Sequence, residues 1–244
     1  MRLQVLGCGD AFGSGGRFQT CFHVTAAATR FLIDCGATSM VAIRRFGIDP
    51  NAIDTVFVTH LHGDHFGGLP FLILDAQLVS RRDRPLTLAG PPGFRQRLTV
   101  LMESCFPGSS TIERKFALEL IELAPETRAT VNGVALTPYV VSHPSGAPSF
   151  ALRLEIDGKV LAYSGDTEWV EALTQAGRDA DLFICEAYVY AKKVKFHLDA
   201  VTLLAHVPRI RPKRLILTHM GPDMLERAAP PGCERAEDGQ VIEF

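Results

Sequence analysis

Short apolar runs rich in Val, Ile, Leu and Phe recur along the whole chain and alternate with polar, glycine-containing segments. Such runs, bounded by turn signals, are typical of buried β-strands. They predict strands at residues 3–6, 21–25, 31–34, 55–58, 86–89, 118–123, 134–141, 150–156, 160–164, 182–185 and 214–217. The Asp-Gly pair within residues 156–159 predicts a hairpin turn between two of these strands.

Helical patterns fall between the strands and predict helices at residues 38–46, 69–79, 93–103, 168–176 and 199–206. Asp166 and Thr167 come directly before the fourth of these segments and predict its N-terminus. Blocks of strands separated by helices imply layers of sheet and helix around one core. No low-complexity linker divides the chain, so we expect residues 1–244 to form a single domain.

The composition is ordinary for a globular protein, because 47% of the residues are hydrophobic and 21% are charged. A net charge of -2 argues against a protein that binds nucleic acid with its whole surface. Basic clusters lie at residues 81–84, 192–195 and 209–214 and are interpreted as solvated surface. The second cluster precedes His197 closely and is placed to guide an anionic substrate.

Three features of the sequence bear on where in the cell the protein is expected to be. The first residues carry one positive charge and no long apolar run, so we expect no signal peptide. No apolar stretch reaches membrane-spanning length, so we expect no membrane partner. The six cysteines are scattered without a Cys-x-x-Cys pair, which favours reduced thiols and a cytoplasmic location.

The segment from His60 to His65 concentrates polar side chains in one loop, since it contains His60, His62, Asp64 and His65. Crowding ionisable groups costs free energy unless something binds them together. Imidazole nitrogen and carboxylate oxygen are the donors that a zinc-like ion prefers. A polar loop of unrelated side chains is the alternative, but the predicted strand at residues 55–58 runs directly into the motif and would hold ligands rigidly.

Three further residues repeat this placement, because His143, Asp166 and His219 each follow a predicted strand closely. Strand ends at one edge of a sheet converge, so residues distant in sequence can meet there. Taken singly, each is equally well explained as a turn residue; in order with the first motif they predict a shared site. His23 and His206 lie inside a strand pattern and a helix pattern and are interpreted as structural.

The motif His60-x-His62-x-Asp64-His65, followed by His143, Asp166 and His219, resembles in type and order the metal residues of the metallo-β-lactamase-fold hydrolases. The glycine-rich opening and the strand at residues 31–34 are also similar to that family. The resemblance implies an α/β (α+β) fold, a four-layer αββα sandwich of two mixed β-sheets flanked by helices. The site would lie along one edge of the sheets.

The resemblance also implies a binuclear metal centre. One ion would be held by His60, His62 and His143, and the other by Asp64, His65 and His219. Asp166 would bridge both ions, and it stands where the antibiotic-degrading lactamases usually carry Cys. Five imidazoles and two carboxylates suit two Zn²⁺ ions, and Mn²⁺ or Fe²⁺ can use the same set.

Such a centre implies hydrolysis. Two metal ions that share one water lower its pKa toward ~7, and the bridging hydroxide attacks an electrophilic phosphorus or carbonyl carbon. We therefore expect a metal-dependent hydrolase, a phosphodiesterase or related esterase, in which Asp64 orients the hydroxide.

A closer resemblance is to the ribonuclease Z-like branch, whose members carry a Glu and a late His for the leaving group. Glu186 and His197 match these two residues, whereas Cys185 and Tyr188 replace the His and Thr of the branch's His-Glu-Ala-Thr element. The resemblance implies that Glu186 steers His197, which gives a proton to the departing oxygen. The alternatives are that Glu186 pairs with a nearby lysine and that His197 is a surface residue at a helix start.

The substrate is predicted from a difference within that branch. The tRNA-processing members commonly insert a long arm after the His that corresponds to His143. Here only residues 144–165 separate His143 from Asp166, and a predicted hairpin fills them. With the slightly acidic chain, this favours a small anionic ester over nucleic acid. Alternatives are a ribonuclease Z-type RNA endonuclease and a non-catalytic metal-binding accessory or carrier protein. Homodimers are common among similar proteins, although nothing in the composition shows one.

Overall fold

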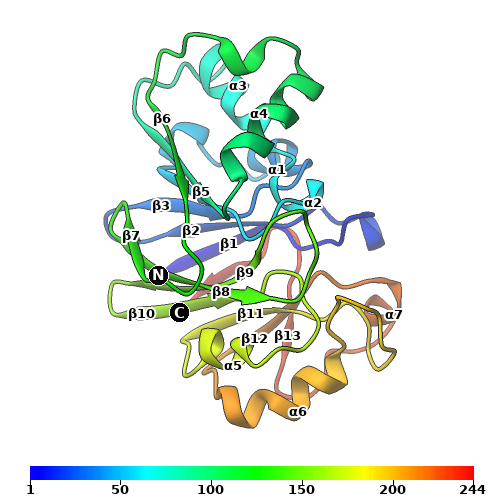
Figure 1. The fold of residues 1–244 in the computed structure, drawn as a ribbon. Coiled ribbons are helices and arrows are strands. Elements are labelled where there is room, and N and C mark those ends of the chain that lie inside the picture. Colours follow the sequence, from blue (N-terminus) through cyan, green and yellow to red (C-terminus); the bar gives the residue numbers. More distant parts are fainter.

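Two β-sheets of seven strands each lie face to face in the computed structural model, which describes residues 1–244 (Figure 1). The first sheet has the order β14 (Val241–Glu243), β1 (Arg2–Gly7), β2 (Cys21–Thr25), β3 (Arg30–Ile33), β4 (Thr55–Phe57), β5 (Leu86–Gly90) and β6 (Leu118–Glu122). The second has the order β13 (Glu234–Arg235), β12 (Leu215–Thr218), β11 (Leu182–Glu186), β10 (Lys159–Tyr163), β9 (Ser149–Ile156), β8 (Val134–Val141) and β7 (Ala129–Val131).

Both sheets are mixed in the same way. Neighbouring strands are antiparallel from β14 through β1 and β2 to β3 in the first sheet, and from β7 through β8 and β9 to β10 in the second. Neighbouring strands are parallel from β3 through β4 and β5 to β6, and from β10 through β11 and β12 to β13. Parallel strands end at the same edge of their sheet, so the residues that follow β3, β4, β10, β11 and β12 are brought close together.

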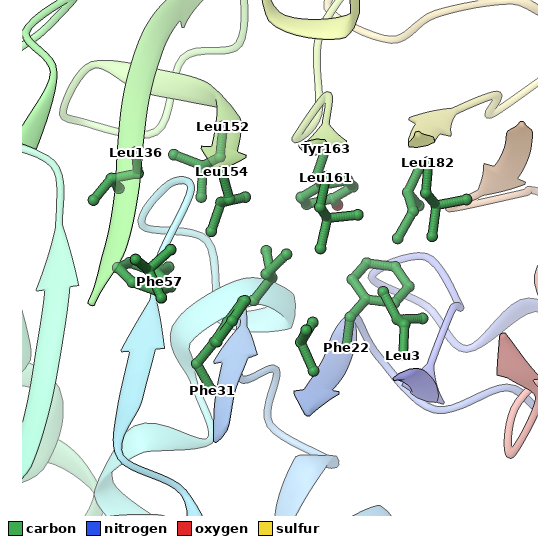
Figure 2. Packing of buried hydrophobic residues seen from close by; sticks show 14 of the residues in the cluster. Leu3, Phe22, Phe31, Phe57, Leu136, Leu152, Leu154, Leu161, Tyr163 and Leu182 are labelled. Atoms are coloured by element: carbon green, nitrogen blue, oxygen red, sulfur yellow. The ribbon is translucent and has the colours of Figure 1, made fainter. Parts of the chain in front are cut away.

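The main core fills the space between the sheets. A cluster of 24 buried residues is shared by the two inner faces. In Figure 2, the rings of Phe22, Phe31 and Phe57 point from the first sheet toward the leucines of the second and toward Tyr163. Phe22 meets Tyr163 edge to face at 5.3 Å between ring centroids, a favoured aromatic geometry.

Helices cover both outer faces. On the first sheet, a 21-residue apolar cluster includes side chains of α1 (Ser39–Arg45), α3 (Leu69–Leu78) and α4 (Phe94–Cys105). On the second sheet, α5 (Ala172–Gly177) and α6 (Ala200–Ile210) join a cluster of 17 residues. The short helices α2 (Gly63–Phe66) and α7 (Pro222–Leu225) both lie on the right-hand side of Figure 1. The predicted αββα sandwich of two mixed sheets is thereby confirmed.

Every predicted strand is present, and β2 and β8 have their predicted bounds. The strands β7, β13 and β14 were not predicted. Each contains only two or three residues and lies at the edge of a sheet, where no continuous apolar run is needed. The predicted hairpin turn at residues 156–159 joins β9 to β10.

The predicted start of the fourth helix is wrong, because α5 begins at Ala172 rather than after Thr167. The intervening residues bond to other strand ends instead. The Thr167 hydroxyl accepts a hydrogen bond from the Ser142 amide at 3.0 Å, and the Thr167 amide donates to Glu186 at 2.7 Å. Glu168 accepts from the Ser142 hydroxyl at 2.7 Å. These bonds fix the chain after Asp166 in a non-helical path.

The cysteines and the helices bear on two expectations about the chain as a whole. All six cysteines are free, as their scattered positions predicted. Among the helices, none has both the length and the apolar character that crossing a membrane requires. His206 stacks on Trp169 at 3.7 Å between ring centroids, outside the cluster of metal-type residues described below.

His23 predicts an acid sensitivity of folding. It is 4% exposed on β2, and neither ring nitrogen has a hydrogen-bond partner. Burial, together with the nearby Arg2 and Arg30, lowers the pKa of His23 from 6.5 to about 4. Below its ordinary pKa the unfolded chain binds a proton that the folded chain rejects, so the free energy of unfolding falls as the pH drops from about 6.5 to about 4.

The loss of unfolding free energy attributable to His23 is about 3.5 kcal/mol at most, since one pKa unit corresponds to about 1.4 kcal/mol. Urea unfolding of chelator-treated protein at several pH values measures it. We expect His23→Leu to have a flatter pH dependence than the wild type in this window. An unchanged slope would show that other groups cause the acid sensitivity.

Candidate metal centre

Strand ends supply the residues of the site. The His60–His65 segment follows β4, and Asp34 follows the neighbouring strand β3. From the second sheet, His143 follows β8, Asp166 follows β10 and His219 follows β12. The structure brings together all seven residues that the sequence predicted as metal ligands, in two adjoining groups.

The first group contains His60, His62 and His143, whose ligand atoms all lie within 4.8 Å of one another. Nε2 of His143 is 2.9 Å from Nδ1 of His62. The three rings meet nearly edge to face, with centroids 4.8–5.0 Å apart. Such a geometry points three ring nitrogens at one small volume.

The second group contains Asp64, His65, Asp166 and His219. Asp64 Oδ2 lies 3.3 Å from Nε2 of His65 and 3.2 Å from Nε2 of His219. Asp166 Oδ2 lies 3.2 Å from the same two nitrogens. It is also 3.9 Å from Nε2 of His60 and of His143, so this oxygen stands between the two groups.

The outer ring nitrogens are held by other groups. His65 Nδ1 lies 2.7 Å from an oxygen of Asp34, which is fully buried. His60 Nδ1 is 3.0 Å from the Thr59 hydroxyl, which donates in turn to Asp34 at 2.8 Å. His143 Nδ1 donates to the carbonyl of Phe196 at 2.9 Å. Outer partners of this kind fix the orientation of metal-binding imidazoles and leave the inner nitrogen free to bind.

Unpaired buried atoms at the centre show that the residues fit a metal ion. Nε2 of His60, Nε2 of His65 and Oδ1 of Asp166 are buried without a hydrogen-bond partner. Buried polar atoms are rarely left in this state, and each one costs free energy. Nitrogen and carboxylate donors suit a divalent cation such as Zn²⁺, which would satisfy these atoms.

Electrostatics distributes protons unevenly within the centre. Burial and the charge of His65 lower the pKa of His60 well below its ordinary value. Burial also opposes charge on His219, but the carboxylates, Asp166 first, outweigh it and raise the pKa of His219 to about 10. Burial raises the pKa of Asp166, but His219 and His65 outweigh it and hold the carboxyl ionised. A cation must displace the imidazole protons, so metal binding releases protons and weakens in acid.

Glu186 and His197 lie beside the second group. Glu186 is fully buried, and its Oε1 binds Nδ1 of His197 and lies 3.5 Å from Nδ1 of His219. The alternative that Glu186 pairs with Lys192 or Lys193 is wrong, because its carboxylate instead binds His197 and accepts a hydrogen bond from the Thr167 amide at 2.7 Å. Burial lowers the pKa of His197, but the bond to Glu186 outweighs it, and the net pKa is raised.

A pocket of about 210 Å³ opens onto these side chains. It is lined by residues of both groups, by His197 and Tyr188, and by the loop at residues 10–12. His197 is 22% exposed, so its ring reaches the pocket while its Nδ1 is held by Glu186. The arrangement places a proton-carrying side chain next to a candidate metal centre in a solvent-accessible cavity.

Sequence reasoning missed several residues around the site. Asp34 was assigned to the end of a strand, whereas β3 ends at Ile33 and Asp34 adopts a left-handed φ of 57°. Its position just past the observed strand matches the placement of His143, but the predicted strand extended to residue 34 and concealed this signal. The carbonyl of Phe196 carried no such signal, because its contact with His143 depends on the folded loop.

Asp34 is expected to tune metal affinity without touching the metal. Asp34→Asn keeps the shape but removes the charge that orients His65, and loss of such outer partners costs about 10- to 100-fold in metal affinity. Competition with a chromophoric chelator measures the dissociation constant of Zn²⁺. Asp54→Asn is the matched control, since Asp54 bonds to the Arg30 amide outside the site. Equal affinities for both variants would rule out this role.

Comparisons with known proteins extend to nearly the whole chain. The Anti-Pycsar protein Apyc1 family matches residues 1–241. Ribonuclease Z from Bacillus cereus (strain AH820) is 26% identical over an alignment of 277 positions, which covers 90% of this chain and 88% of that protein.

Solved structures agree with the layered architecture. Human tRNase Z, short form, superposes with a TM-score of 0.81 at 26% identity and covers 100% of this chain and 99% of that chain. The metallo-β-lactamase fold protein YhfI from Bacillus subtilis superposes with a TM-score of 0.81 at 19% identity, with coverage of 100% and 99%. These likenesses confirm the predicted metallo-β-lactamase fold.

Proposed function

The chain belongs to the Anti-Pycsar protein Apyc1 family, and we propose that it is a hydrolase that cleaves phosphodiesters with a pair of divalent metal ions. The observation that carries the proposal is the convergence of seven nitrogen and oxygen donors next to the His197–Glu186 pair. The resemblance to ribonuclease Z and tRNase Z, whose names denote cleavage of RNA, supports the choice of a phosphodiester.

The two groups suggest how two ions would be held. His60, His62 and His143 would bind one ion, and Asp64, His65 and His219 the other. Asp166 Oδ2 would bridge them, since it is within 3.9 Å of four of the imidazoles. Zn²⁺ fits this set best, and Mn²⁺ or Fe²⁺ can use the same donors.

When bound, the two ions would supply an activated water and neutralise charge on the phosphoryl group. The protein's own side chains would do the rest. Asp64 lines the pocket and would accept a hydrogen bond from the attacking water. His197, with Nδ1 held by Glu186, would present its protonated Nε2 to the departing oxygen, because an alkoxide leaves poorly without a proton.

The shape of the chain between two of the ligands favours a small ester. β9 and β10 pair as a hairpin and occupy the segment between His143 and Asp166, where an inserted RNA-gripping arm would be expected. The net charge of -2 also gives little general attraction for a polyanion. We therefore place a small anionic diester ahead of tRNA as the substrate.

The test combines metal analysis with turnover. Elemental analysis of the purified protein should find about two metal ions per chain. The loaded protein should then hydrolyse bis(p-nitrophenyl) phosphate and either 2′,3′- or 3′,5′-cyclic nucleotides. Full metal loading without turnover of any ester would overturn the proposal and favour the accessory or carrier protein.

Ribonuclease Z-type cleavage of RNA is the second candidate, because both 26%-identical relatives are named for it. It predicts that a tRNA precursor is cut and that its binding weakens steeply with salt. The same metal-loaded preparation distinguishes the two functions by the ratio of kcat/KM for the precursor to that for the small diesters.

A further inference from the structure

An exposed aromatic side chain stands at the mouth of the metal pocket. Phe12 is 86% exposed, more than any other large hydrophobic side chain of the protein. It is also the only one of the strongly exposed hydrophobic residues that lines the metal pocket. A single exposed apolar residue needs no explanation, but one placed beside a candidate reaction centre does.

The loop that carries Phe12 is firmly held. The carboxylate of Asp10 accepts hydrogen bonds from the Phe12 amide at 3.2 Å, the Ser14 amide at 2.8 Å and the Ser14 hydroxyl at 2.6 Å. Gly13 follows with a left-handed φ of 67°, which turns the chain back directly after Phe12. The exposed ring is therefore presented by a constrained backbone.

Both ends of this loop are held by Asp238, which lies between β13 and β14. Asp238 accepts hydrogen bonds from the Cys8 amide at 3.1 Å and from the Phe18 amide at 2.7 Å. The Cys8 carbonyl accepts from the His219 amide at 3.1 Å. One end of the loop that carries Phe12 therefore bonds to the backbone of a proposed metal ligand.

A second aromatic ring lines the same pocket. The ring of Tyr188 lies 4.8 Å from that of His197 and 6.1 Å from that of His219, measured between centroids. It rests on Gly221, where a Cβ atom would come within 3.0 Å of the ring. The pocket thus combines ionic donors at its base with two aromatic side chains, a setting that suits an anion attached to a flat ring.

We propose that Phe12 is a specificity-determining residue that stacks on a planar aromatic ring of the ester substrate while Tyr188 contacts the same ligand inside the pocket. The inference rests on the proposed function and narrows it to esters that carry an aryl or heteroaryl group. Stacking is the expected contact, because an exposed and preorganised ring gains most by covering a flat apolar face.

Binding without turnover tests the proposal. Calorimetry on the Zn²⁺-loaded protein compares phenylphosphonate with methylphosphonate, which share the anionic group and differ in the ring. The wild type should bind phenylphosphonate about five- to tenfold more tightly, which is the lower end of the range that one aromatic stack provides. Phe12→Ala should lose this preference, whereas Phe12→Trp should retain it. Leu78→Ala is the matched control, since Leu78 is 66% exposed but lies outside the pocket.

Turnover gives a second readout. Bis(p-nitrophenyl) phosphate and methyl p-nitrophenyl phosphate have the same leaving group and differ only in the ester group that stays. The ratio of their kcat/KM values should fall about five- to tenfold in Phe12→Ala and should not change in Leu78→Ala. If no diester is hydrolysed, the proposed function fails, while the calorimetric preference still tests Phe12.

Two results would overturn the inference. One is a phenyl preference that is absent in the wild type, and the other is a preference that is identical in the wild type and Phe12→Ala. If the preference is identical and Phe12→Ala also has a lower molar mass in light scattering, the exposed ring is assigned to a contact between copies of the chain.

Discussion

Asp166→Asn is expected to weaken metal binding and hydrolysis together. Asp166 Oδ2 is 3.2 Å from Nε2 of His65 and of His219, and it lies between the two groups of donors. The amide has nearly the same shape but no charge, so neither ion keeps the carboxylate that would bridge them. Loss of an outer partner of a metal ligand already lowers metal affinity or activity by about 10- to 100-fold, and loss of a bridging ligand should lower them by more than that.

The measurement is metal content after dialysis, together with kcat/KM for bis(p-nitrophenyl) phosphate. We expect fewer than about one ion per chain, compared with about two in the wild type, and a loss of more than about 100-fold in kcat/KM. Asp181→Asn is the control. Asp181 precedes β11 at the end of the strand opposite to Glu186 and binds Lys213 at 2.8 Å. Full metal content in Asp166→Asn would contradict the assignment of the bridge.

The centre could be predicted from the sequence where ligands are close neighbours in the chain. His60, His62, Asp64 and His65 follow one strand within six residues, and their spacing alone indicates a site. The meeting of His143, Asp166 and His219 with that motif depends on the order of strands in both sheets. Physical reasoning supplied the rule that strand ends converge, but only the family resemblance supplied the order of the ligands.

Residues that act through backbone geometry could not be predicted. Phe196 has a left-handed φ of 66°, which turns its carbonyl toward His143. Nothing in a phenylalanine indicates that its backbone oxygen will orient an imidazole. For Thr167 the sequence did carry a signal, but it was misleading. Its side chain is typical of a helix start and instead bonds to Ser142, directly after β8. In both cases tertiary contacts overrode the local pattern.

The fold followed more directly from the sequence than the site did. The two sheets are specified by apolar runs whose successive side chains alternate between the shared core and the outer helices. In β4, for example, Phe57 lies in the main core and Val56 in the outer cluster. Edge strands such as β13 escaped prediction because two residues, Glu234 and Arg235, carry no periodicity. That the chain forms one functional domain stays a prediction.

His197→Ala is expected to reduce turnover according to the leaving group. The ring of His197 lines the pocket, and Glu186 holds its Nδ1. General acid catalysis typically contributes about 10²- to 10⁴-fold when the leaving group needs a proton. We therefore expect a loss in this range for 3′,5′-cyclic nucleotides, which release an alkoxide. The p-nitrophenolate of bis(p-nitrophenyl) phosphate leaves without a proton, so its hydrolysis should fall less than about tenfold.

Comparing the two substrates separates a proton donor from a structural residue. If His197 only supported the pocket, both reactions would slow by the same factor. His206→Ala is the matched control, because His206 stacks on Trp169 away from the pocket and should leave both rates unchanged. Metal content must be equal in all three proteins, since His197 also lies near His219, with ring centroids 5.8 Å apart. If turnover of both substrates fell by the same factor at full metal content, a group other than His197 would be the proton donor. The assignment of the metal centre would be unaffected.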